Sequence, residues 1–236
     1  RQEGDVTLAE RIGEAQIKPT VDLIAEAGDR GGVGDEDVIA VAAAAVDAVL
    51  ACRAERGTTM ANAVANLPVI SWDEFLALDW PHEWAAGVAY AMGATTPRHA
   101  QLCARLAGLI PVRGECSAYA AGLVVYVAEL DRGFLPDLTV VCGPPIEADG
   151  KPGGVTNPTI VFEVLSPGTQ AHDRTTKLDA YRRLPSLETY VLLHQDGARA
   201  EVHSRNPDGS WRSEERTGGV LELPRGLRVD LDELSR

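Results

Sequence analysis

Positive charge is scarce in this sequence. Its 236 residues include 22 Lys and Arg against 35 Asp and Glu, which gives a formal net charge of -13 at pH 7. Non-specific adhesion to nucleic acid or to an anionic membrane depends mainly on basic residues that displace counterions, so the composition counts against both. An acidic protein can still act on phosphodiesters through a local basic patch and a metal that masks its acids. The residues that we expect in such a patch are Arg98, Arg105, Lys177, Arg182 and Arg183.

Cysteine is also rare. The four cysteines, at positions 52, 103, 116 and 142, are far apart and form no Cys-x-x-Cys pair. The five histidines show no ligand spacing around them, so a structural zinc site is not expected. Reduced thiols fit this pattern best, and we predict that Cys103 and Cys142 are core residues.

Targeting segments and long apolar runs are absent as well. No segment combines the basic start, apolar core and small-residue cleavage site of a signal peptide. The longest apolar stretch, residues 38–52, is rich in alanine and interrupted by Asp47, which does not suit a membrane-spanning helix. We therefore expect a soluble, cytoplasmic protein with no membrane partner.

Aromatic residues are missing altogether from residues 1–59, which also hold few large aliphatic residues. Such a segment cannot build much core by itself. Alanine dominates residues 37–56, and the acidic residues 35–37 lie where a helix N-terminus favours negative charge, so we predict a helix there. We interpret residues 1–59 as a helical appendage that packs on the main domain, mediates self-association or stays partly disordered. Residues 67–236 form the predicted compact domain.

Cap and turn signals divide this compact domain into elements. Ser71 and Glu74 form a capping box that opens a short helix ending at Leu78, and Thr96 caps a second helix. Residues 143–158 are half glycine and proline, which predicts a surface loop without regular structure. The other predicted elements are two short strands around Gly87, strands at 116–128, 138–142, 159–165, 189–194, 199–204 and 210–216, and a helix at 171–184.

The strands at 138–142 and 159–165 are continuous apolar runs instead of alternating ones. Such runs are typical of strands that are buried on both faces, with helices covering the sheet. The sequence therefore predicts an α/β fold with a mixed sheet and flanking helices.

Two acidic residues and a lysine form a pattern that indicates a catalytic site. Asp137 stands at the start of one apolar strand, Glu163 lies inside the next, and Lys177 follows on the predicted helix. An isolated carboxylate in so apolar a run is costly unless a cation compensates it. Two neighbouring carboxylates resolve their repulsion by sharing a proton or by binding a hard divalent cation such as Mg²⁺. Lys177 would then orient or activate a water molecule.

Each of these residues also has a purely structural interpretation. Asp137 follows a proline and could mark a turn at the entry to the strand. Glu163 could be an edge-strand acid that faces solvent. Lys177 could pair only with Asp173 one helical turn earlier, which is worth about 0.3–0.5 kcal/mol. Taken jointly, the three residues favour the functional interpretation.

Three stretches carry a resemblance to a known family. They are Phe-Leu-Pro-Asp137-Leu-Thr-Val-Val-Cys-Gly, then Pro-Thr-Ile-Val-Phe-Glu163-Val-Leu-Ser-Pro-Gly-Thr, then Asp173-Arg-Thr-Thr-Lys177-Leu-Asp-Ala-Tyr181. With these stretches, residues 67–236 resemble the Uma-two restriction endonuclease family of the PD-(D/E)xK nuclease superfamily. Residues 1–59 are not covered by the resemblance.

The resemblance implies a restriction-endonuclease-like core and a Mg²⁺ or Mn²⁺ site that cuts phosphodiester bonds of DNA. Carried over by position, Asp137, Glu163 and Glu83 would be metal ligands. Lys177 would be the catalytic lysine. One departure concerns Leu165, which stands two positions after the glutamate, where the superfamily normally has its lysine. The family places the lysine on the following helix instead, which Lys177 satisfies.

Three further residues are expected to support this site. His99 begins the core-facing stripe of its helix, and we interpret it as a buried histidine with a satisfied hydrogen bond, against a role at the substrate. Asp173 and Tyr181 lie four residues to either side of Lys177 on one helical face, and we expect them to hold it in place.

Two functions are compatible with these residues. The first is a metal-dependent endonuclease that acts on DNA as a homodimer, because double-strand cleavage usually needs a two-fold dimer. The alternative is a catalytically inactive nuclease-fold protein that serves as an interaction or assembly module. The net charge and the unusual residues 1–59 favour the alternative, whereas the intact acid and lysine pattern favours the enzyme.

Overall fold

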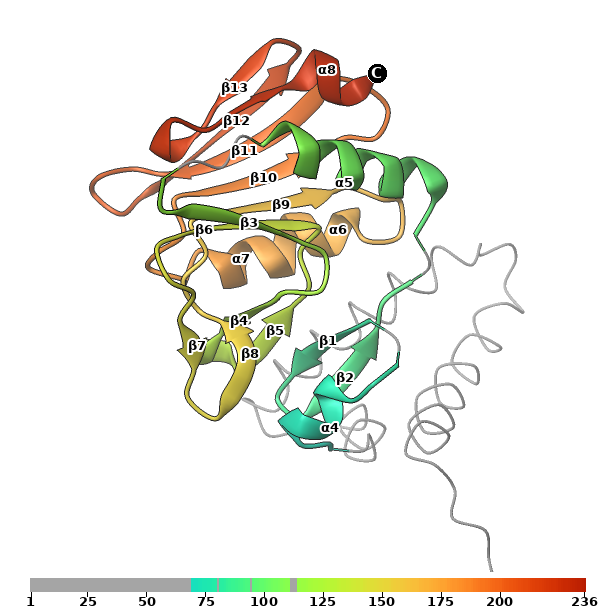
Figure 1. The fold of residues 1–236 in the computed structure, drawn as a ribbon, viewed down its shortest axis with the longest axis vertical. Coiled ribbons are helices and arrows are strands. Elements are labelled where there is room, and N and C mark those ends of the chain that lie inside the picture. Colours follow the sequence, from blue (N-terminus) through green and yellow to red (C-terminus); the bar gives the residue numbers. More distant parts are fainter. Residues whose placement is uncertain (1–68, 80, 94, 111–113) are drawn as a thin grey trace, which may run out of the picture. The chain divides into compact units, whose positions relative to one another are not determined.

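The computed structural model describes residues 69–236 except 80, 94 and 111–113 (Figure 1). The predicted appendage and its helix at 37–56 lie outside the described residues. The chain divides into two units, one with residues 1–79 and 87–89 and the other with residues 80–86 and 90–236. Every predicted site residue belongs to the second unit. Within the described part of the chain, no helix is long and apolar enough to cross a bilayer.

In the first unit, a capping box starts the short helix α4 (Trp72–Leu76). The backbone N–H of Glu74 donates to the hydroxyl of Ser71 over 3.2 Å, and the carboxylate of Glu74 accepts from the N–H of Ser71 over 2.7 Å. These reciprocal bonds satisfy two donors at the helix start. The predicted capping box is confirmed, and the helix ends two residues before the predicted end.

The second unit is organised by a mixed sheet of six strands in the order β12-β11-β10-β9-β6-β3. The β9 and β10 strands are parallel, and the other neighbours in this sheet are antiparallel. All residues of β9 and β10 are buried, and so are all residues of β6 except Cys142, which confirms that the strands predicted at 138–142 and 159–165 are covered on both faces. The six strands are β3 (Cys116–Ala120), β6 (Leu138–Cys142), β9 (Ile160–Val164), β10 (Thr189–Leu193), β11 (Arg199–Arg205) and β12 (Trp211–Thr217).

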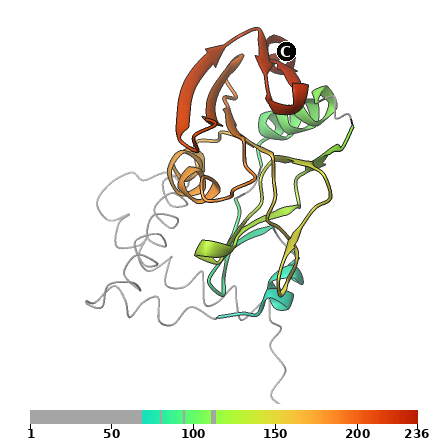
Figure 2. The ribbon, with the colours of Figure 1, turned by 90° about the vertical axis from the view of Figure 1, so that its left-hand side faces the viewer.

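Helices cover the two faces of this sheet (Figures 1 and 2). On one face lies α5 (Pro97–Leu109), whose Leu102 and Leu106 belong to the same buried cluster as Phe162 of β9. The other face is covered by one continuous helical segment, in which Tyr181 is clustered with Val161 of β9. Because neighbouring residues of a strand point to opposite faces, Glu163 lies on the side of this second segment. Its parts are α6 (Gln170–His172), the π-helix η2 (Asp173–Lys177) and α7 (Leu178–Tyr181).

A second sheet in the same unit places one acidic residue of the site. Within this unit its strands follow the order β1-β5-β4-β8-β7. The bounds are β1 (His82–Ala85), β2 (Val88–Ala91), β4 (Val124–Val127), β5 (Arg132–Phe134), β7 (Glu147–Ala148) and β8 (Lys151–Val155). The remaining elements are η1 (Ala128–Leu130), β13 (Val220–Glu222), η3 (Pro224–Gly226), β14 (Arg228–Asp230) and α8 (Leu231–Ser235).

Two predictions about strands are wrong. The predicted strand at 116–128 is two strands, β3 and β4, and they are separated by a turn in which Gly122 has a φ of 111°. The predicted loop at 143–158 contains the hairpin β7–β8, whose turn places Gly150 at a φ of 65°. An Asp-Gly pair is a strong hairpin signal, and Asp149-Gly150 is such a pair. The prediction missed it because the many glycines and prolines around it favoured an irregular loop.

The prediction of reduced thiols is also wrong for one pair. Cys116 and Cys142 form a disulfide between β3 and β6. The two residues are direct partners in the register of these antiparallel strands. The register is a tertiary property, so the 26 residues that separate the cysteines gave no sign of the bond. Cys103, on α5, is half-buried and is not part of a disulfide.

Truncating a fully buried leucine of α5 should destabilise the domain. Leu106 is 0 % exposed, so we expect Leu106→Ala to lower the free energy of unfolding by about 2–5 kcal/mol through lost burial and a residual cavity. Leu109→Ala makes the same chemical change at a half-buried position of the helix and should cost clearly less. Urea denaturation measures both. Equal losses would contradict the assignment of this helix face to the core.

Candidate active site

Glu163 occupies the middle of β9 and is 3 % exposed. The alternative of an edge-strand acid facing solvent is therefore wrong. A carboxylate buried among apolar neighbours needs compensation, since its desolvation costs several kcal/mol when it is left unpaired. The compensation is Lys177, whose Nζ donates to Oε1 of Glu163 over 3.0 Å.

Lys177 is itself buried and faces three carboxylates. Its Nζ lies 3.0 Å from Oε1 of Glu163, 3.0 Å from Oε1 of Glu83 and 3.1 Å from Oδ1 of Asp173. The predicted pairing with Asp173 is confirmed, but it is one of three contacts instead of a lone surface pair. Three carboxylates around one ammonium leave an excess of negative charge, which a shared proton or a cation relieves.

The helical segment that carries Lys177 is wound as a π-helix from Asp173 to Lys177. Single π-turns within helices are rare and are frequent at functional sites. His172 immediately precedes this turn, and its Nε2 lies 3.1 Å from Oε2 of Glu83. The hydroxyl of Tyr190, on β10, donates to the backbone carbonyl of Asp173 over 3.1 Å, which ties the start of the π-turn to the sheet.

Tyr181 supports the site in a different way from the one predicted. Its hydroxyl donates to Oε1 of Glu163 over 3.4 Å, so it contacts the glutamate. His172 was not predicted from the sequence. The spacing of Asp173 and Lys177 indicates which face of a regular α-helix they share. A π-turn changes which neighbouring residues lie on that face, so the contribution of His172 could not be predicted from the spacing.

Glu83 reaches Lys177 from β1 of the second sheet. The position of β1 is fixed by pairing with β5, in which Trp84 is the partner of Gly133. Trp84 also donates through Nε1 to Oδ1 of Asp131 over 2.8 Å. Burial by itself would raise the pKa of Glu83, but the charge of Lys177 and the contact with His172 lower this pKa to about 2. Glu83 is therefore ionised at neutral pH.

Asp137 stands one residue before β6, whose Leu138 is the partner of Phe162 in β9. Continuing this register by one residue places Asp137 opposite Glu163. Oδ2 of Asp137 accepts the backbone N–H of Val164 over 2.7 Å and lies 3.2 Å from Nε2 of His99. The prediction that the two acids belong to neighbouring strands of one sheet is therefore confirmed, and the convergence of their carboxylates stays a prediction.

His99 holds Asp137 in its charged form. Burial alone would raise the pKa of Asp137, but the hydrogen bond and charge of His99 lower it. In the same way, burial would lower the pKa of His99, whereas its hydrogen bond to Asp137 raises it. The predicted hydrogen bond of His99 is confirmed, but the histidine is half-buried instead of buried, and its partner is a candidate metal ligand.

The pKa values of Glu163 and Lys177 are both raised, which disfavours the charge of the glutamate and favours that of the lysine. Burial raises the pKa of Glu163 well above its usual value, and the charges of Asp173 and Asp137 raise it further despite Lys177. Burial would lower the pKa of Lys177, but Glu163, Glu83 and Asp173 together raise it well above its usual value. The ammonium is firmly protonated, and Glu163 is the acid that most needs additional positive charge.

The predicted basic patch does not form around Lys177, which is enclosed by carboxylates. Arg98 donates to the backbone carbonyls of Gln195 and Ser235, and Arg105 lies 3.5 Å from the carbonyl of Leu234. The other two arginines have acidic partners: Arg182 lies 3.7 Å from Asp179, and Arg183 contacts Glu129. The prediction of a joint patch is wrong because each of these side chains is used elsewhere in the fold.

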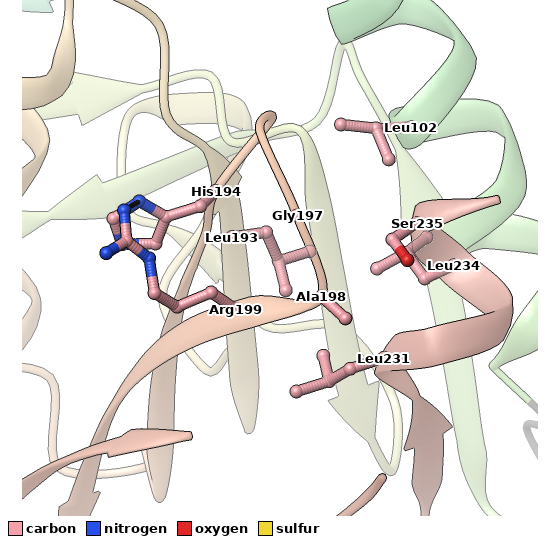
Figure 3. Close-up of a pocket in the computed structure, with 9 residues that line it drawn as sticks. All are labelled: Leu102, Leu193, His194, Gly197, Ala198, Arg199, Leu231, Leu234 and Ser235. Atoms are coloured by element: carbon pink, nitrogen blue, oxygen red, sulfur yellow. Dashed lines mark hydrogen bonds between the residues drawn. The ribbon is translucent and has the colours of Figure 1, made fainter. Parts of the chain in front are cut away.

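A small cavity lies apart from these residues, between the β10–β11 turn and α8 (Figure 3). Its volume of about 10 Å³ corresponds to a single water molecule. Leu102, Leu231 and Leu234 contribute apolar lining, and none of the predicted site residues contributes to it. This cavity is a packing feature of the core.

The mixed sheet with helices on both faces, and the acids gathered with a lysine at its centre, define a restriction-endonuclease-like fold. A crystal structure from Anabaena variabilis, described as "a putative nuclease belonging to DUF820", aligns with a TM-score of 0.52. The alignment covers 70% of this chain and 97% of that chain at 17% sequence identity. The predicted fold class is thereby confirmed.

The chain belongs to the Uma2 family, described as "Putative restriction endonuclease", which matches residues 72–235. Two proteins of Synechocystis sp. are similar to it. The uncharacterized protein slr1290 is 31% identical over 157 residues, which span 62% of this chain and 80% of the relative. The uncharacterized protein sll1609 is 27% identical over 144 residues, 60% of this chain and 81% of the relative. The family predicted from the sequence is confirmed.

Removing the central cation should destabilise the fold strongly. Lys177→Met leaves three buried carboxylates without their common partner, and breaking a buried ion pair in this way costs about 3–5 kcal/mol. Adding Glu163→Gln to this variant should recover part of the loss, because one uncompensated charge is then removed. Urea denaturation of both variants in EDTA tests this. A loss below about 1 kcal/mol in Lys177→Met would show that the lysine is not the counterion of the site.

The depressed pKa of Glu83 should appear in the pH dependence of stability. A carboxyl with a lowered pKa in the folded state contributes stability above its unfolded pKa of 4.5, and that stability is lost as pH falls toward 2. Each proton taken up adds a slope of about 1.4 kcal/mol per pH unit. We therefore expect the unfolding free energy of Glu83→Gln in EDTA to fall less steeply below pH 4.5 than that of the wild type.

The matched control for this measurement is Glu222→Gln, because Glu222 is an exposed acid whose partner is Arg228 on the neighbouring strand. Its curve should run parallel to that of the wild type. Parallel curves for all three proteins would contradict the assignment of a lowered pKa to Glu83.

Proposed function

We propose that this chain is a divalent-cation-dependent endonuclease that hydrolyses phosphodiester bonds of DNA. The observation that carries the proposal is the buried Lys177, which contacts Glu163, Glu83 and Asp173 beside the paired strand that carries Asp137. A fold needs no such concentration of acids for its stability, because apolar residues of similar volume are often as stabilising. The family description of a restriction endonuclease supports the same function.

The donor set fits a hard divalent cation. Oε1 of Glu83 and Oδ1 of Asp173 are buried and lie 3.0 Å and 3.1 Å from the Lys177 ammonium, which they share with Glu163. Buried carboxylate oxygens that outnumber the positive charge beside them are suitable ligands for Mg²⁺ or Mn²⁺, which prefer oxygen. We assign Asp137 and Glu163 as the ligands and Glu83 as an additional one. A bound cation would supply Lewis acidity toward the phosphate and lower the pKa of a water molecule.

Lys177 has two tasks in this proposal. While the site is without substrate, its ammonium neutralises part of the charge on Glu163 and Glu83. During hydrolysis, the same donor would orient the attacking water or stabilise the negative charge that grows on the phosphoryl oxygens. Asp173 keeps the ammonium in place over 3.1 Å, and the π-turn sets the direction of the lysine side chain.

The remaining parts of the proposal concern the partners. One acid–lysine site per chain cuts one strand at a time, so cleavage of both strands implies a homodimer on a two-fold axis. The net charge of -13 counts against strong non-specific attraction to DNA, and therefore we expect productive binding to depend on the divalent cation.

The second candidate is a nuclease-fold protein without catalytic activity that serves as an interaction or assembly module. One observation favours it. The arginines expected to contact DNA are engaged within the chain, and Lys177 is saturated by carboxylates. The two candidates differ in whether phosphodiester hydrolysis depends on the acids and the lysine.

Nicking of supercoiled plasmid by the purified full chain with Mg²⁺ or Mn²⁺ separates them. We expect Asp137→Ala and Lys177→Ala each to lower the rate by about 10²-fold or more, because each removes a group that acts in the transition state. The exposed variant Glu222→Gln should retain wild-type activity. Equal nicking by all proteins would identify a contaminating nuclease and remove the enzyme proposal. Thermal stabilisation by Mn²⁺ that vanishes in Glu163→Gln reports cation binding independently.

A further inference from the structure

A second group of potential metal ligands includes Asp137 and takes its other two members from α5 instead of from the helical segment of Lys177. It consists of His99, Cys103 and Asp137, and one ligand atom from each residue lies within 4.8 Å of the others. Sγ of Cys103 is 3.5 Å from Nδ1 of His99, and Nε2 of His99 is 3.2 Å from Oδ2 of Asp137. These three residues form what we name the thiol cluster.

The geometry of the thiol cluster comes from two rigid elements. His99 and Cys103 are four residues apart on α5, so their side chains lie on one face of the helix. The expectation that no histidine has a ligand spacing to a cysteine is wrong for this pair. Asp137 is fixed at the start of β6 by the N–H of Val164. Cys103 is half-buried, and the side chains of His99 and Asp137 are only 15% and 16% exposed. The cluster is therefore preformed and sheltered, yet open enough to admit an ion.

The chemistry of the donors differs from that of the carboxylate site. Thiolate sulfur and imidazole nitrogen are ligands of borderline-soft cations such as Zn²⁺ and Co²⁺, whereas Mg²⁺ prefers oxygen alone. In tetrahedral zinc sites the ligand atoms lie roughly 3.3–3.8 Å apart, given metal–ligand distances of about 2.0–2.3 Å. The contacts of 3.5 Å and 3.2 Å involve different ring nitrogens of His99, and with one ligand atom from each residue the three atoms lie within 4.8 Å of one another, so they must draw closer together to reach that range. Three protein ligands leave a fourth position for water, as in open zinc sites.

We propose that the thiol cluster is a binding site for a zinc-class divalent cation, with Cys103, His99 and Asp137 as ligands. Binding replaces the hydrogen of the thiol: the sulfur–hydrogen bond is broken, the sulfur–metal bond forms, and the proton passes to solvent. One ring nitrogen of His99 coordinates the ion after a small rotation of the ring. Mg²⁺ does not occupy this site.

Occupation of the thiol cluster has a consequence for the carboxylate site, and this consequence rests on the proposed nuclease function. Asp137 belongs to both groups, since it lies opposite Glu163 and contacts His99. A zinc-class ion that holds Asp137 would withdraw it from the catalytic cation. Zn²⁺ should therefore inhibit magnesium-dependent cleavage, and this inhibition should require Cys103.

Cobalt is the direct probe of the site, because a thiolate bound to Co²⁺ gives an intense near-ultraviolet charge-transfer band that oxygen ligands do not give. We expect this band when Co²⁺ is added to the wild type, and we expect Cys103→Ser to abolish it. Cys52→Ser is the matched control, since it removes another cysteine, and it should retain the band. His99→Gln should weaken cobalt binding at least about tenfold, as expected for the loss of one ligand of three.

The outcomes separate the possibilities. No thiolate band in the wild type, an unchanged band in Cys103→Ser, or a band that disappears with Cys52 would overturn the proposal. Thermal melting without metal shows whether Cys103→Ser and His99→Gln are folded. If the wild type cuts no plasmid at all, the nuclease function fails while the cobalt spectrum still decides this site. If it does cut, added Zn²⁺ should inhibit the wild type and spare Cys103→Ser.

Discussion

The contact of the Lys177 ammonium with Glu163 is the interaction on which the rest of the site depends. Neither group is stable alone in its surroundings, because the glutamate lies in the middle of a fully buried strand and the lysine is 3 % exposed. Glu83 and Asp173 complete the shell of the ammonium. The Lys177 ammonium therefore joins parts of the chain that are distant in sequence, namely β1, β9 and the π-turn.

This arrangement explains why the site is built on rigid elements. β9 is held between β6 and β10, and the helices cover both faces of this sheet (Figure 2). The proposed ligands that come from strands are thereby fixed by backbone hydrogen bonds, and the lysine comes from a helical segment in which the carbonyl of Asp173 accepts a hydrogen bond from Tyr190. Such preorganisation keeps charged groups in place before substrate arrives, which is what electrostatic catalysis requires.

Much of the fold and of the central trio was predictable from sequence. The apolar runs around Asp137 and Glu163 predicted buried neighbouring strands, and the structure has them as β6 and β9. Glu83 followed only from the family resemblance, because a short strand of another sheet gives no pattern that points to Lys177.

Other features could not be predicted because they depend on tertiary structure. The Cys116–Cys142 bond follows from strand register, and the contact of His172 with Glu83 follows from the π-turn. The same limit applies to the expected basic patch: an arginine in a sequence does not reveal that a nearby backbone carbonyl will bind it. Local patterns thus identified the elements, whereas partners across the fold required coordinates.

The thiol cluster gives Asp137 a second possible cation, because the same aspartate belongs to both proposed metal sites. Its proposed partners are the carboxylate of Glu163 for Mg²⁺ and the sulfur and nitrogen of α5 for a zinc-class ion. His99 stabilises the charged form of Asp137, because its hydrogen bond and its charge lower the pKa of that carboxyl. Binding of a zinc-class ion to Asp137 would thereby inhibit the proposed reaction, which uses the same aspartate to bind Mg²⁺.

The most direct test of the central claim is a crystal structure of the full chain grown with Mn²⁺ and recorded for its anomalous scattering. The account predicts an anomalous peak within ligand distance of Asp137 and Glu163, with Lys177 beside it. A well-ordered structure with these residues in place and no peak at the two carboxylates would contradict the claim that they form a divalent-cation site.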